Sequence, residues 1–93
     1  MASLPRNQAV TTSWVALPDI PAHGVSILNS TGAALFIATQ ADITAGGGTP
    51  AANTIRTLPD GMSEGYELTI SAKELCIKAA AGAAGVQLNI YNV

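Results

Sequence analysis

The side chains that could perform covalent or acid–base chemistry are few and widely spaced. His23 is the single histidine of the chain and Cys76 the single cysteine. A thiol nucleophile needs a neighbouring base and surroundings that lower its pKa. Cys76 instead stands between Leu75 and Ile77 in an alternating segment, where a small, half-buried side chain is its expected role. His23 has no second His or Cys nearby, so the pattern favours neither a Cys–His pair nor a zinc site.

Three carboxylates and a glycine run are the other candidates for chemistry. Asp60, Glu64 and Glu67 surround one turn, and carboxylates in such a group can bind calcium or act as acid and base. The same spacing is common at solvated turns. Gly46 to Thr49 lacks the lysine and the helix that a phosphate-binding loop requires. We therefore expect a protein that is not an enzyme, with no catalytic residue, metal or cofactor.

The composition points to a protein that works through its surfaces. Only 11% of the 93 residues are charged, against about 25% in a typical domain. The net charge is −2, and the four basic residues are scattered, which argues against nucleic-acid binding. Hydrophobic residues make up 48% of the chain, so much of the surface must be uncharged. Either the many alanines explain this value, or part of the surface is buried against other subunits.

Alternating apolar and polar residues predict the fold class. From Gly65 to Tyr91 three successive segments have period 2, as half-buried strands do. Together with earlier apolar runs they predict an all-β protein, a small antiparallel β-sandwich or barrel of about seven short strands. The predicted strands are 14–17, 25–28, 35–39, 54–58, 66–70, 74–78 and 86–91. The inward side chains should be Val25, Ile27, Leu35, Ile37, Ile55, Tyr66, Leu68, Ile70, Leu75, Ile77, Val86, Leu88 and Ile90.

The remaining segments predict one domain with an appendage. Residues 1–13 have no apolar periodicity and are rich in Thr, Ser, Asn and Gln. We interpret them as an extended N-terminal arm, able to pair with a strand edge of a neighbouring subunit, with 14–93 as the single β-sandwich domain. Residues 42–53 contain three successive glycines and a proline, which predicts a long mobile loop. The N-terminus has no apolar signal region, and no run is long enough to span a membrane.

Several turn and strand motifs resemble a known group of proteins. They are Asn29-Ser30-Thr31-Gly32 between two strands, Pro59-Asp60-Gly61-Met62-Ser63, a strand ending in Lys78, and a final strand over 86–91. In this arrangement residues 25–93 resemble the small β-sandwich virion proteins of tailed bacteriophages. The resemblance implies a capsid decoration, or cement, protein that stabilises the outer surface of a head built by other subunits. Small tail and head–tail connection proteins share the pattern.

The expected partners are therefore the major capsid protein or other virion subunits, and further copies of the chain as a dimer or trimer. The expected location is the virion, after synthesis in the bacterial cytoplasm, which a lone cysteine suits. The alternative is a small sandwich that binds carbohydrate or a receptor through Phe36, Tyr91 and the loop 42–53. No nucleic-acid or membrane partner is expected. The residues predicted to form the interface are Leu4, Arg6, Trp14, Phe36 and Tyr91.

Overall fold

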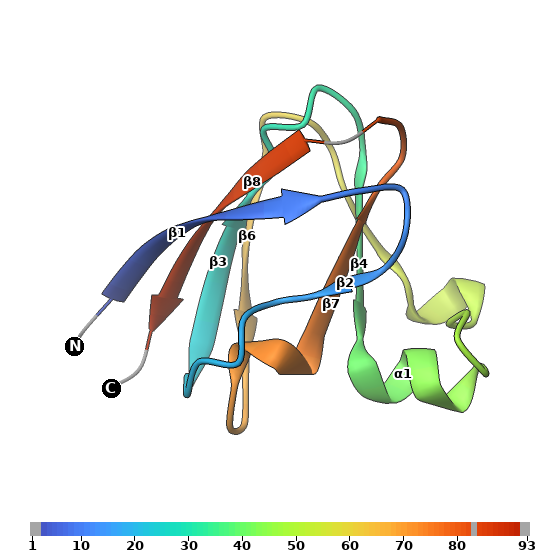
Figure 1. Ribbon diagram of the computed structural model, residues 1–93, viewed down its shortest axis with the longest axis horizontal. Helices are drawn as coiled ribbons and strands as arrows, with labels where there is room; N and C mark the ends of the chain where they lie inside the picture. The colour runs from blue at the N-terminus through green and yellow to red at the C-terminus, as the bar shows by residue number, and fades with distance from the viewer. Residues whose placement is uncertain (1–2, 83, 92–93) are drawn as a thin grey trace.

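Two antiparallel four-stranded sheets face each other in the computed structural model, which describes residues 3–82 and 84–91 (Figure 1). We call them sheet A, with strand order β1-β8-β3-β6, and sheet B, with order β2-β7-β4-β5. The all-β, sandwich-type fold predicted from the sequence is thus confirmed. The elements are β1 (Ser3–Val10), β2 (Val15–Ala16), β3 (Gly24–Leu28), β4 (Leu35–Thr39), α1 (Gln40–Ala45), η1 (Ala52–Thr54), β5 (Arg56–Leu58), β6 (Ser63–Glu67), η2 (Ala72–Glu74), β7 (Leu75–Ala79) and β8 (Ala84–Tyr91).

The core lies between the sheets and takes the inward side chain of every second strand residue. Alternation places successive side chains on opposite faces, so one register of each strand is buried. Ten of the predicted inward residues are buried in this cluster: Val25, Ile27, Leu35, Ile37, Leu68, Leu75, Ile77, Val86, Leu88 and Ile90. Their burial confirms the register predicted for β3, β4, β7 and β8.

Two inward predictions differ from the structure, since Ile70 is 76% exposed and Ile55 is only partly buried. Tyr66 is also partly buried, but it packs against the core as predicted. The alternation of residues 66–70 continues in the sequence after β6 has ended at Glu67. Ile70 therefore belongs to a turn, where its amide donates to the Glu74 carboxylate and its side chain points away from the core. Tyr66 lies at the open side of the sandwich, beside Arg56 of β5.

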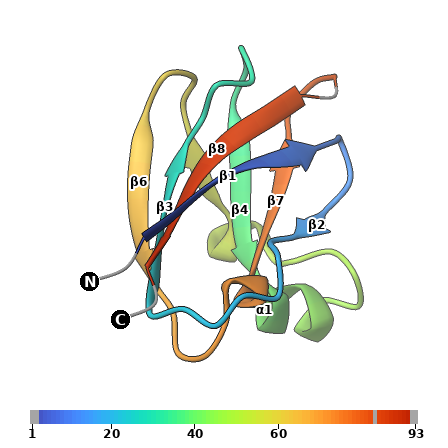
Figure 2. The same cartoon turned by 60° about the vertical axis from the view of Figure 1, so that its left-hand side comes forward.

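The segment predicted as a separate arm is part of the sandwich. Residues 3–10 form β1, which pairs with β8 over its whole length, and Val10 is buried in the core. The two ribbons cross in both views, β1 in blue and β8 in red (Figures 1 and 2). The separation of 1–13 from the domain was therefore wrong. β1 is an edge strand with β8 as its one neighbour, and its residues 5–9 are mostly exposed.

Part of the predicted loop 42–53 is helical. Helix α1 covers Gln40–Ala45 and begins at the cap Thr39, whose Oγ1 accepts from the Asp42 amide at 3.1 Å. Its Ile43 is buried. Gly47 and Gly48 follow with positive φ, a backbone form that ends a helix most easily at glycine. The short helix η1 leads from this turn into β5.

One end of the sandwich is held by Asn29, which is fully buried. Its Nδ2 donates to the carbonyls of Ala33 and Leu58, at 2.7 and 2.8 Å, and its Oδ1 accepts from Thr31. The Gly32 amide donates to Asp60 Oδ1 at 2.9 Å. The two turn motifs around Asn29 and Asp60 therefore form one cross-linked cluster, which joins the β3–β4 and β5–β6 connections.

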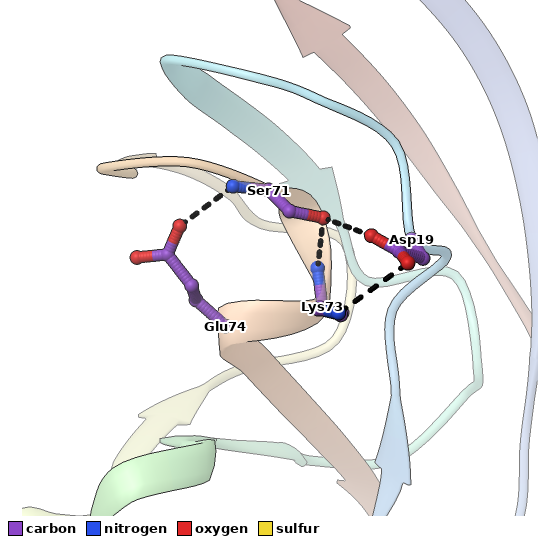
Figure 3. A network of polar contacts seen from close by, with 4 residues as sticks. All are labelled: Asp19, Ser71, Lys73 and Glu74. Atoms are coloured by element: carbon purple, nitrogen blue, oxygen red, sulfur yellow. Dashed lines mark hydrogen bonds and ion pairs between the residues drawn. The ribbon is translucent and has the colours of Figure 1, made fainter.

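The opposite end is held by a polar network around η2 (Figure 3). Ser71 Oγ donates to Asp19 Oδ1 at 2.9 Å, and Lys73 Nζ lies 3.3 Å from Asp19 Oδ2. These contacts attach the proline-containing segment 18–21 to η2, and the hydrogen bonds from Ser71 and Lys73 lower the pKa of Asp19.

Glu74 closes the same turn. Its carboxylate accepts from the Thr69 hydroxyl at 2.6 Å and from the amides of Ile70 and Ser71 at 2.6 and 2.7 Å. These donors hold the pKa of Glu74 at about 2. A carboxylate with this many donors is stabilised in its charged form. The turn is therefore stabilised by a carboxylate that stays ionised far into the acidic range.

Candidate functional site

The structure gives Cys76 and His23 separate structural positions. Cys76 is buried on the outer face of β7, where its Sγ donates to Gln40 Oε1 at 3.2 Å. Burial raises the pKa of this thiol, which disfavours the reactive thiolate. The His23 backbone joins two strands, its amide donating to the Tyr91 carbonyl and its carbonyl accepting from the Leu68 amide.

The three carboxylates Asp60, Glu64 and Glu67 have three different environments. Asp60 accepts the Gly32 amide, whereas Glu64 forms an ion pair with Arg56 that spans the sandwich between β5 and β6. Glu67 belongs to the opposite register of β6, facing outward from sheet A. Among residues 3–82 and 84–91, no three His, Cys, Asp or Glu side chains are grouped as metal ligands would be. The two outer faces of the sandwich are thus the surfaces to consider.

The outer face of sheet B carries an aromatic cluster, which we call the aromatic face. Lys78 of β7 lies between the buried residues Ile77 and Ala79, so its side chain points away from the core. Its Nζ lies 5.2 Å from the centre of the Trp14 ring and 5.7 Å from that of Phe36. Both distances suit cation–π attraction. Two of the predicted interface residues, Trp14 and Phe36, are therefore brought together around one cation.

Trp14 also connects this face to a second, smaller apolar cluster. Ala38, Ile43 and Cys76 are buried there, and Trp14 packs against them while remaining partly exposed. Ile43 comes from α1, and Figure 2 shows this helix at the end of β4. Because α1 and Trp14 hold the cluster from two sides, the aromatic face is a fixed surface.

The outer face of sheet A is built from small and uncharged side chains. The pairing registers align Asn7, Gln87, Leu28 and Ser63 in one row across the four strands, and Pro5, Asn89, Ser26 and Gly65 in the next. A hollow of about 520 Å³ lies over these rows, and we call it the sheet A hollow. Its lining comprises Pro5, Arg6, Asn7, Ser26, Leu28, Ser63, Gln87, Leu88 and Asn89.

The other predicted interface residues lie on or near sheet A. Arg6 is exposed on β1 and borders the hollow. Tyr91 follows Asn89 on the outer register of β8 and is partly exposed. The side chain of Leu4 is outside the part of the chain that the structure describes. Phe36 and Tyr91 are therefore on opposite faces, so the carbohydrate-binding set that paired them cannot form one surface.

Sequence reasoning missed the amide residues of the hollow and the cation of the aromatic face. The signal for Gln87 and Asn89 was present, since both alternate with buried residues of the last strand. Asn7 belongs to a strand that has no apolar period of its own. Lys78 was recognised as outward-facing, but the alternation says nothing about which aromatic rings approach it. These groupings follow from strand order, which pairs β1 with β8 and β7 with β4.

Comparisons with known proteins leave both surfaces without an assigned role. In the described residues no helix has the length and apolar character needed to cross a membrane. Searches against protein-family models, curated proteins and solved structures found no significant match for the chain.

Proposed function

We propose that the protein is a non-enzymatic virion structural protein, a decoration protein that binds and stabilises the outer surface of a phage capsid. The observation that carries this proposal is the aromatic face, where Trp14 and Phe36 flank Lys78 on sheet B. Aromatic side chains are enriched in the cores of protein interfaces and often contribute most of the binding energy. The turn and strand motifs that resemble those of phage virion proteins are the reason for proposing a capsid as the partner.

The charge distribution supports attachment by this face. Lys78 is the one charged residue of the aromatic cluster, and its ammonium group faces two aromatic rings. An interface built on this surface would bury both rings, and the partner would have to supply an acidic group for Lys78, because a charge buried without a partner is costly. The proposed partner is the major capsid protein, with several copies of this chain attached as a dimer or trimer.

The test uses capsids produced without this protein, to which the purified chain is added. Co-sedimentation should show saturable binding, and the decorated capsids should withstand a higher temperature than capsids without this protein. Phe36→Ala should weaken binding at least about tenfold, because truncating an interface anchor typically costs more than 1 kcal/mol. Tyr91→Ala removes an aromatic ring from the opposite face and is the matched control.

The melting temperature of each free variant shows whether it is folded. If the wild-type chain does not bind capsids, the proposal is wrong. If Tyr91→Ala releases the chain while Phe36→Ala binds normally, the attachment surface is on sheet A instead.

A further inference from the structure

The sheet A hollow has the dimensions of a ligand site. Its volume of about 520 Å³ falls within the roughly 300–1,000 Å³ typical of small-molecule sites. Small residues lie at its centre: Ser26 of β3 pairs with Gly65 of the edge strand β6 on one side and with Asn89 of β8 on the other. The hollow is formed by regular strands, so its side chains have fixed spacing.

The chemistry of its lining is that of uncharged hydrogen bonding. Asn7 and Gln87 each offer an amide oxygen and an amide nitrogen, Asn89 offers its amide nitrogen, and Ser26 and Ser63 offer hydroxyls. The lining contains no carboxylate, and its one cationic residue is Arg6 of the edge strand, which pairs with Leu88 and therefore has its side chain in the inward register. A single cation is too little for a nucleic-acid or polyphosphate ligand, which needs several. The hydrogen-bond donors and acceptors of the lining instead suit a ligand with hydroxyl groups, because a hydroxyl group can both donate and accept a hydrogen bond.

Asn89 provides an independent observation. Its Oδ1 is buried, yet it accepts no hydrogen bond from any described residue. A buried acceptor without a donor is uncommon in a folded protein and destabilises it. Asn89 lines the hollow, and because its Oδ1 is buried, its Nδ2 is the amide atom that it presents there as a hydrogen-bond donor.

The apolar residues of the lining suit the carbon surface of a sugar ring. Pro5 and Leu28 belong to the two outer-face rows and provide carbon surface beside the amides. A sugar ring presents C–H groups on its faces and hydroxyls around its rim, so it can contact both kinds of surface together. A free amphiphile would need a larger apolar lining, and a peptide strand would need an open sheet edge rather than a face.

We propose that the sheet A hollow is a binding site for a neutral, polyhydroxylated ligand, an oligosaccharide. Asn7, Gln87 and Asn89 bind its hydroxyls, and Pro5 and Leu28 contact its ring. The site lies on the face opposite the aromatic face, so it does not depend on attachment to a capsid. A chain attached by sheet B would carry the site on its free side.

The experiment uses the full chain labelled with ¹⁵N, titrated with millimolar maltohexaose, cellohexaose, mannohexaose and xylohexaose, and with oligoalginate as the anionic comparison. At least one neutral oligosaccharide should shift the side-chain amide signals of Asn7, Gln87 and Asn89. Gln87→Ala should weaken that binding about tenfold, the effect of removing one net hydrogen bond. Gln8→Ala is the control, because Gln8 is on the adjacent strand in the opposite register.

Three results would overturn the proposal. The first is that no neutral oligosaccharide shifts these amide signals, or that only the anionic one does. The second is equal binding by Gln87→Ala, Gln8→Ala and the wild type. The third is that the amide signals change with protein concentration and not with sugar, which would mean that a second copy of the chain covers the hollow. Capsid binding is not measured here, so these results are independent of the proposed decoration function.

Discussion

The outer faces of the two sheets differ in what covers them. On sheet B, helix α1 and Trp14 pack over Cys76 and Ala38. On sheet A the outer face carries amides, hydroxyls and glycines, and no helix of the described chain lies on it. The difference is visible in single strands. β7 has three buried residues in succession, Leu75, Cys76 and Ile77. In β8 burial alternates strictly from Gly85 to Ile90. A strand that is covered on both faces loses the two-residue period of burial, whereas a strand covered on one face keeps it. The burial pattern along β7 and β8 therefore shows that sheet B is covered on its outer face and sheet A is not.

The largest expected effect tests whether sheet A requires β1. Removal of residues 2–12 should abolish the cooperative thermal transition. It deletes the whole β1–β8 ladder and the buried Val10, and leaves the apolar side of β8 beside water. The free energy of unfolding of a folded domain is only about 5–15 kcal/mol. Circular dichroism during heating measures the outcome, with exposed Arg6→Ala as the folded control. A truncated chain that melts normally would return 1–13 to the role of an independent arm.

The next effect compares the two registers of β8. Leu88 is 3% exposed and faces the core, while its neighbour Gln87 faces the hollow. Leu88→Ala should lower the free energy of unfolding by about 2–5 kcal/mol. Gln87→Ala should change it by less than about 0.5 kcal/mol, as exposed substitutions usually do. Urea denaturation measures both values, and similar losses for the two variants would contradict the register.

A smaller effect separates the two outer faces directly. Ile43 is 7% exposed and fills the cluster under α1, so Ile43→Ala should cost about 2 kcal/mol, near the lower limit for such truncations. Ser26→Ala on the outer face of sheet A should cost less than about 0.5 kcal/mol. If Ile43→Ala is as mild as Ser26→Ala, α1 does not stabilise sheet B.

The smallest expected effect is the contribution of the Glu74 carboxylate to the pH dependence of stability. Its pKa of about 2 lies below the ordinary value of 4.5, so the folded state binds this proton less readily than the unfolded state. The resulting stability is present above pH 4.5 and is lost as the pH falls toward 2. Glu74→Gln should flatten the stability profile in that window. Thr69→Val, which removes one donor, should flatten it only in part. Chemical denaturation at several pH values measures the three profiles.

The sequence predicted the strands that alternate and missed those that do not. β3, β4, β7 and β8 were found because one register of each is buried by apolar residues. β1 was missed because only Val10 among its described side chains is buried, and its place depends on β8. Helix α1 had a usable signal in the capping pair Thr39 and Asp42, but the glycines that follow favoured a loop.

The surfaces were less predictable than the strands. Trp14 and Phe36, both predicted interface residues, do lie together around Lys78, but Tyr91 was grouped with them although it lies on the other sheet. A sequence gives the register of a residue along its strand, whereas the sheet order decides which residues are neighbours across strands. The hollow joins β1, β8, β3 and β6, and no local pattern specifies that order.

The pairing of β1 with β8 has a consequence for how the chain folds. Ser3 pairs with Tyr91, so the β1–β8 ladder at the edge of sheet A joins segments from nearly opposite ends of the sequence. During synthesis β1 emerges long before β8 and must wait for its partner. Closing so large a loop is entropically costly, and proteins dominated by such distant pairings fold in roughly milliseconds to seconds rather than microseconds. In that interval Pro5 and Arg6, which interrupt a bare strand edge, would also disfavour pairing with other nascent chains.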